Sequence, residues 1–280
     1  MKSILLPTDF SKNSVNAIEF AVELFSNQVC DFYILNVQKA SSFISDDMMA
    51  VSSSATIYRT IVDAAKKSID NIISKVESQY KNERHNFHSL IDYDNFTDAI
   101  NQVSEKHEID LIIMGTKGAS GLEKALFGSN TVRVIKRCSK PILAIPDGCR
   151  FSDLTKIVFA TTNLKPFVIN ELKVLKEFVD DNNAELSIIH IADKNHSTYK
   201  TFDNSVLYDT YFEEAKHDYI DSVSNDMFDE IHDYNIANDA KMLIVKNKKH
   251  SFLGRLFSKH GLETLAFKID IPFLVLPTTD

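Results

Sequence analysis

The stretch LIIMGTKG, residues 111–118, is followed after nine residues by GSNT, residues 128–131. Its apolar beginning is typical of a buried strand, and a helix-like pattern starts where GSNT ends. Gly115 and Gly118 allow the backbone to approach a ligand where a Cβ would collide. Gly128 stands just before the helix, where free N–H groups and the helix dipole favour an anion. The stretch therefore predicts a phosphate cradle between a strand and a helix.

Polar side chains complete the predicted cradle. Ser129 can cap the helix, and Ser129 and Thr131 offer hydroxyls to phosphate oxygens. Lys117 can meet a phosphate as a point charge. The spacing matches neither the Walker pattern nor Gly-x-Gly-x-x-Gly. The cradle is thus of another kind than the two commonest phosphate loops.

Apolar runs alternate with helix-like segments along residues 1–147, and a long helix is predicted for 56–80, after a polar insertion at 38–55. Strands that alternate with helices indicate an α/β fold with a parallel sheet covered on both faces. Such sheets bind ligands beyond the carboxyl ends of their strands. Asp9 follows the first run directly, either as a ligand contact or as the N-cap of the first helix. The predicted strands are 3–7, 32–37, 87–91, 111–114 and 141–145.

The same order of runs recurs in the second half, which predicts two copies of one α/β unit, residues 1–147 and 154–280. From the fourth strand onward the halves align without a gap. Lys246, Lys249 and Lys259 then take the places of the three cradle glycines. A lysine does not permit the close backbone approach of a glycine, so the second half is expected not to bind the same ligand. Its shorter middle also predicts a trimmed long helix. The matching runs are 156–162, 186–191, 242–245 and 271–277.

Both the segment PTDFS, residues 7–11, and the spacing Gly-x2-Gly-x9-Gly-Ser-x-Thr resemble the universal stress protein family. The chain looks like a tandem member whose second domain is degenerate. The resemblance implies two Rossmann-like domains of the adenine nucleotide alpha hydrolase type, each a five-stranded parallel sheet flanked by helices. It further implies ATP as the ligand of the first half, with any Mg²⁺ held by the phosphates. The halves would pair through their last strands as an internal pseudo-dimer, and a further homodimer is an open alternative.

The resemblance also assigns roles to individual residues. Asp9 would contact the ribose or adenine, the backbone at Val37 would meet the adenine, and Met114 would lie by the ribose. Asn36 stands where many members have a histidine. The complete implied nucleotide site is Pro7, Thr8, Asp9, Val37, Met114, Gly115, Lys117, Gly118, Gly128, Ser129, Asn130 and Thr131.

Composition limits the class of protein. A net charge of −8 argues against a general nucleic-acid binder or a protein of anionic membrane surfaces. No apolar run approaches the roughly 20 residues that span a bilayer. The three cysteines match no metal spacing and suit a reducing compartment. We therefore expect a cytoplasmic protein without a metal site.

No catalytic residues emerge from the sequence, because the predicted cradle lacks an obvious general base. The expected function is a non-enzymatic, ATP-binding stress-response module that changes its partners with occupancy. A slow ATPase or phosphotransfer enzyme and a nucleotide-independent scaffold remain as alternatives. The lysines of the second half, Lys246, Lys249 and Lys259, are either solvated loop charges or a site for a different anion or an acidic partner.

Overall fold

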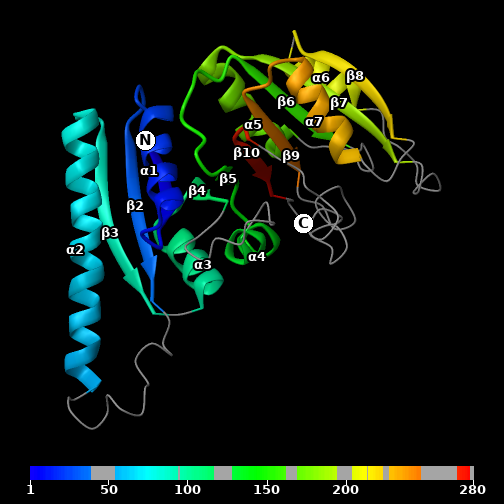
Figure 1. Cartoon of the computed structure of the whole chain (residues 1–280). Helices are drawn as coiled ribbons and strands as arrows, with labels where there is room; N and C mark the ends of the chain where they lie inside the picture. Colours follow the sequence, from blue (N-terminus) through cyan, green and yellow to red (C-terminus); the bar gives the residue numbers. More distant parts are fainter. Residues whose placement is uncertain are drawn as a thin grey trace. The chain divides into compact units, whose positions relative to one another are not determined.

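The computed structural model describes residues 1–38, 54–93, 95–116, 128–161, 169–193, 204–212, 214–222, 227–246 and 270–277. The described residues form two compact units. The first unit ends at Phe151 and the second begins at Ser152. Figure 1 labels most of the helices and strands of both.

The first unit is a parallel sheet with helices in its connections (Figure 1). Its strand order is β3-β2-β1-β4-β5, and every strand pair recorded in it is parallel. Helix α1 contacts α2, and α3 contacts α4, as expected for helices that cover opposite faces. The elements are β1 (Lys2–Pro7), α1 (Lys12–Leu24), β2 (Cys30–Val37), α2 (Ser54–Tyr80), β3 (His85–Asp92), α3 (Phe96–Lys106), β4 (Leu111–Gly115), α4 (Ser129–Arg137) and β5 (Ile142–Ile145).

Burial explains why these segments became strands and helices. All residues of β4 and β5 are buried, as in a sheet that is covered on both faces. Helix α1 begins after Ser11, whose side chain accepts a hydrogen bond from the backbone N–H of Ser14. Its buried face carries Ile18, Phe20 and Val22, and it packs on β4 and β5. Helix α1 therefore packs against β4, with its first turn beside the carboxyl end of that strand.

The second unit repeats the strand order of the first, as β8-β7-β6-β9-β10. Its recorded strand pairs are also parallel. The helix described between β7 and β8 is the seven-residue α6, where the first unit has the 27-residue α2. The elements are β6 (Lys156–Thr161), α5 (Ile169–Asn182), β7 (Glu185–Asp193), α6 (Ser205–Tyr211), β8 (Lys216–Ser222), α7 (Met227–Ala237), β9 (Met242–Lys246) and β10 (Phe273–Leu276).

The predicted α/β class with two five-stranded parallel sheets is confirmed. Strand β8 escaped the sequence prediction because its residues, KHDYIDS, do not form an apolar run. The polar insertion predicted at 38–55 lies largely outside the described residues, and the pairing of the halves stays a prediction. Within the described part of the chain, no helix is long and apolar enough to cross a membrane.

Candidate functional site

The candidate site lies at the carboxyl ends of β1 and β4, which are neighbours in the first sheet. From β1 the chain proceeds to β2 and β3 on one side, whereas β4 and β5 lie on the other. This reversal of strand order is a topological switch point, where connections diverge and leave a crevice. Asp9 follows β1, and Gly115 ends β4. The sheet order therefore brings together the two segments that the sequence singled out.

The end of β1 is a tightly bonded turn. The backbone N–H of Thr8 donates to the carbonyl of Leu35 at 2.8 Å, and the Thr8 and Ser14 hydroxyls lie 2.9 Å apart. The Thr8 Oγ1 also accepts from the N–H of Phe10 at 3.0 Å. Phe10 has a φ of 64°, in the left-handed region that a bulky residue rarely adopts. Several bonds thus hold a strained turn at the end of the strand.

This turn leaves the Asp9 carboxylate on the exposed edge. Asp9 Oδ1 accepts from the N–H of Ser11 at 3.1 Å, and Ser11 is the N-cap of α1. The alternative reading of Asp9 as the N-cap is therefore wrong. Pro7 and Thr8 are both buried beneath it, so they shape the turn.

Gly115 is packed against the first turn of α1. A Cβ at this position would lie 2.8 Å from Nδ2 and 2.9 Å from Cγ of Asn13, and 3.1 Å from the Asn13 carbonyl oxygen. Asn13 is itself only 6% exposed, so it has little room to withdraw. Only glycine lets β4 end this close to α1. The sequence predicted a glycine here for close approach to a ligand. The structure gives a second reason, the contact with Asn13.

The start of α4 is tied back to the end of β4. The N–H of Gly128 donates to the carbonyl of Thr116 at 2.5 Å, and the Thr116 N–H donates to the carbonyl of Ile145 at 2.9 Å. Thr131, 2% exposed, directs its hydroxyl at the carbonyl of Gly115, 3.1 Å away, and at that of Thr116, 3.3 Å away. Thr131 therefore holds the helix start against the strand end, a positioning role that the sequence did not reveal.

The N-cap of α4 is Gly128, and no side chain caps it. The prediction that Ser129 caps the helix is wrong, because Ser129 is the first helical residue. Ser129 and Asn130 are exposed. The first N–H groups of a helix have no partners within it, and a glycine cap supplies no acceptor for them. This helix start has the chemistry of an anion-binding end.

The remaining predicted residues are divided between the sheet and the undescribed segment. Val37, half-buried, ends β2, and Met114 is 5% exposed within β4. Lys117 and Gly118 lie outside the described residues. Among the described residues, no group of three or more histidine, cysteine or acidic side chains could hold a metal ion. The arrangement offers an exposed carboxylate, a glycine-ended strand and an uncapped helix start.

The corresponding strand end of the second unit is built differently. Lys246 ends β9, and its ammonium forms an ion pair with the carboxylate of Glu171 in the first turn of α5. The two side chains are only 4% and 7% exposed. The prediction that Lys246 binds an external anion is wrong, because its ammonium is buried and pairs with Glu171 inside the protein. Lys249 and Lys259 lie outside the described residues.

A cluster of rings on β7, β8 and α6 of the second unit was not anticipated from the sequence. His190 Nε2 lies 2.9 Å from His217 Nδ1, and His217 Nε2 lies 3.2 Å from the Asp209 carboxylate. Tyr208 is fully buried beside both histidines, and burial raises the pKa of its phenol. Tyr219 stacks on His190 at 4.7 Å. The residues lie on different elements, so no sequence spacing could have revealed the cluster.

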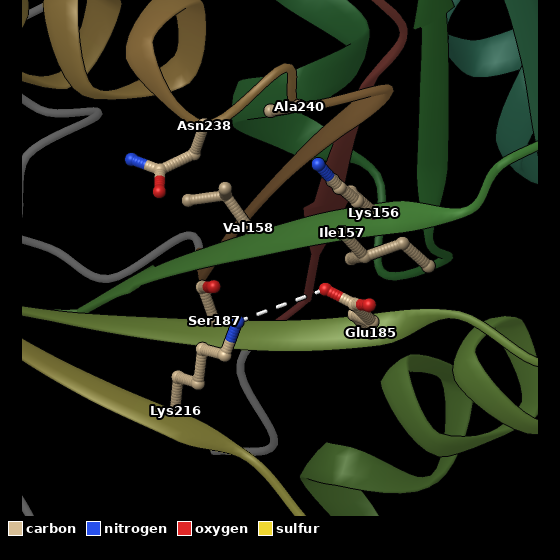
Figure 2. A pocket seen from close by; sticks show the side chains of 8 residues that line it. All are labelled: Lys156, Ile157, Val158, Glu185, Ser187, Lys216, Asn238 and Ala240. Atoms are coloured by element: carbon tan, nitrogen blue, oxygen red, sulfur yellow. Dashed lines mark ion pairs between the residues drawn. The ribbon is translucent and has the colours of Figure 1, made fainter.

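The second unit also has a shallow hollow of about 40 Å³ (Figure 2). Lys156, Glu185 and Lys216 on its wall are the first residues of β6, β7 and β8. The hollow therefore lies at the amino ends of these strands, the edge opposite to the one where parallel α/β sheets bind ligands. This volume falls well below the roughly 300–1,000 Å³ of typical ligand pockets, so the hollow is too small for a nucleotide.

Known proteins resemble the first half of the chain in sequence. The model of the Universal stress protein family matches residues 1–146. One universal stress protein of Methanocaldococcus jannaschii is 29% identical over 144 residues, 51% of this chain and 81% of that protein. A second one from the same organism is 24% identical over 155 residues, 51% of this chain and 94% of that protein.

A solved structure extends the likeness in fold to both halves. The crystal structure of a universal stress protein from Archaeoglobus fulgidus superposes with a TM-score of 0.64 at 18% identity. The alignment covers 98% of each chain. The family model spans just over half of the chain, and the strand order and glycine-ended β4 lie within its span. The chain belongs to the universal stress protein family.

Proposed function

We propose that the first half binds ATP at the carboxyl ends of β1 and β4, and that the protein acts as a nucleotide-responsive module of a stress response. The observation that carries this proposal is the start of α4. Hydrogen bonds from Gly128 and Thr131 hold it against the end of β4, and glycine leaves it uncapped. Phosphates placed there would accept from the first N–H groups of the helix.

The other predicted contacts fit this arrangement. Asp9 is exposed at the end of the neighbouring strand, where a ribose or adenine could meet its carboxylate. Ser129 and Asn130 are exposed on the first turn of α4 and could contact phosphate oxygens. ATP supplies the triphosphate charge that such a site would recognise, together with any Mg²⁺ that its phosphates carry. In this proposal the second half binds no nucleotide, because the buried Lys246–Glu171 pair stands where the first half has Gly115.

We favour a binding module over an enzyme on one ground. Asp9 is the only predicted nucleotide contact with a carboxylate, and it is assigned to the nucleoside end. General-base assistance to phosphoryl transfer would call for a group near the phosphates. A slow ATPase and a scaffold remain the competing functions, and both can be separated from the module by measurement.

The test is the nucleotide content of the full-length protein. The purified chain is denatured, and the supernatant is analysed by mass spectrometry, beside a Gly118→Lys, Gly128→Lys variant that copies the second half. The proposal expects about one ATP or ADP per chain in the wild type and none in the variant. Two per chain would show that the second half also binds.

A wild type that carries no nucleotide and gives no calorimetric signal with added ATP would refute the proposal and favour the scaffold. Release of phosphate over many turnovers, lost in the same variant, would establish an ATPase instead.

A further inference from the structure

Two side-chain amides form a hydrogen-bonded chain beside the candidate site. Asn36 Nδ2 donates to the backbone carbonyl of Thr8 at 2.7 Å, and Gln38 Nε2 donates to Asn36 Oδ1 at 2.5 Å. Asn36 is 4% exposed, whereas Gln38 is half-buried. The chain therefore runs from a buried backbone group out to a side chain that solvent reaches.

The backbone determines which way both amides point. A carbonyl oxygen can only accept, so Thr8 requires the NH₂ group of Asn36. The oxygen of Asn36 then faces Gln38. Because this oxygen can only accept, Gln38 must donate to it from its own NH₂ group. Amide orientations are usually assigned from their surroundings, and here the surroundings allow one assignment. Gln38 is left with its Oε1 acceptor and one further N–H donor, both in the amide plane; when Asn36 takes the N–H that points away from Oε1, these two groups lie side by side.

This donor–acceptor pair is complementary to adenine. Adenine presents a donor at N6 beside an acceptor at N7, which an Asn or Gln amide can bond in bidentate fashion. Guanine presents two acceptors, O6 and N7, at the same edge, so the Gln38 oxygen would face O6 without a hydrogen. A glutamine held in this orientation would favour adenine over guanine when the base presents its N7 edge.

The position of Gln38 suits the base of a nucleotide. It directly follows β2, and the amide chain ends at Thr8, the residue before Asp9. β1 lies between β2 and β4 in the sheet, so the ends of β2 and β4 are roughly 10 Å apart. A nucleoside triphosphate with phosphates at the start of α4 could extend across β1 and place its base at β2.

We propose that Gln38 is a specificity-determining residue that selects adenine over guanine, with Asn36 as the residue that orients it. This inference rests on the proposed nucleotide site in the first half. The second half lacks the device: strand register places His190 and Ala192 where the first half has Asn36 and Gln38. His190 is hydrogen-bonded to His217 instead.

The test compares the affinities of the full-length protein for ATP and GTP by calorimetry. The wild type is expected to prefer ATP, and Gln38→Ala to lose about five- to hundredfold of that preference, the range for one bidentate base contact. Gln28→Ala is the matched control, because Gln28 is also half-buried but lies just before β2, at the opposite edge of the sheet. It should leave the ATP-to-GTP ratio unchanged.

The outcomes separate this inference from the function on which it rests. ATP binding with an ATP-to-GTP ratio that is near one, or unchanged in Gln38→Ala, overturns the role of Gln38 and leaves the nucleotide site standing. Equal losses for both nucleotides in Gln38→Ala overturn it too. Binding of neither nucleotide by the wild type overturns both proposals.

Discussion

The same strand end is built in opposite ways in the two halves. In the first, β4 ends in Gly115, packed on Asn13 of α1; in the second, β9 ends in Lys246, paired with Glu171 of α5. The register of β1 with β4 matches that of β6 with β9, so the two positions correspond. One half keeps a bare backbone at this edge, while the other places two charges there. The comparison shows how a repeated fold can keep its strands while the chemistry at one strand end changes.

Removing one charge of the buried pair should have the largest effect. Glu171→Gln leaves the Lys246 ammonium buried without its counter-charge, which should lower the free energy of unfolding by about 3–5 kcal/mol. Urea unfolding followed by circular dichroism measures the loss. ATP binding should persist if the nucleotide site is in the first half.

Glu177→Gln is the control for this variant, because Glu177 pairs with Lys173 at 3.9 Å on the same helix with both side chains far more exposed. It should cost less than about 0.5 kcal/mol. The double variant Glu171→Leu, Lys246→Met should recover most of the lost stability, since apolar pairs often replace buried ion pairs. Equal costs for the two single variants would contradict the buried pair.

A methyl group at the corresponding position of the first half should have the next largest effect. Gly115→Ala forces a Cβ against Asn13, and we expect a loss of about 1–3 kcal/mol in the free energy of unfolding. ATP affinity, measured by calorimetry, should fall as well. The added Cβ pushes the end of β4 away from the start of α1, and the end of β4 is part of the proposed nucleotide site. Gly115→Ala combined with Asn13→Ala should regain part of the stability. Wild-type stability in Gly115→Ala would show that the space beside Asn13 can accept a methyl group, and would contradict this prediction.

The smallest effect is expected for Glu19, a buried carboxylate whose two cationic partners are exposed. Glu19, 7% exposed, contacts Lys75 at 2.9 Å and Arg150 at 2.8 Å. Burial by itself raises the pKa of Glu19, but the hydrogen bonds and charges of Lys75 and Arg150 outweigh it and lower the pKa below 4.5. Glu19→Gln should therefore cost only about 1 kcal/mol at pH 7.

The sign of the pH dependence follows from the lowered pKa. The folded state holds the Glu19 proton less tightly than the unfolded state does. The stabilising contribution of ionised Glu19 to the free energy of unfolding is therefore present above pH 4.5 and is lost as the pH falls through the lower folded-state pKa. Unfolding of the wild type and of Glu19→Gln at several pH values measures this. The gap between them should narrow below pH 4.5, and a gap that widens there would contradict the assignment.

Strands with continuous apolar runs were predictable, whereas β8 was not. In β4 every residue is buried, so hydrophobicity alone marks it. β8 lies at an edge of its sheet and is mostly polar or charged, with only Tyr219 and Ile220 between its polar ends, so its sequence resembles a loop. A glycine at position 115 was predicted for close approach of the backbone to a ligand, whereas the contact with Asn13 that also requires it was not predictable.

The sequence by itself determined the α/β class, the repeated strand order and a glycine at the end of a buried strand, Gly115. These depend on periodicity and on backbone conformation, which neighbouring residues control. Only the tertiary structure decided that Thr131 bonds to the carbonyl of Gly115, that Asn36 bonds both the carbonyl of Thr8 and the amide of Gln38, and that Lys246 pairs with Glu171. Most of these contacts join residues far apart in the chain; the exception, between Gln38 and Asn36, depends on the distant Thr8 carbonyl that Asn36 bonds. They depend on strand register and on where a helix begins, which no local pattern specifies.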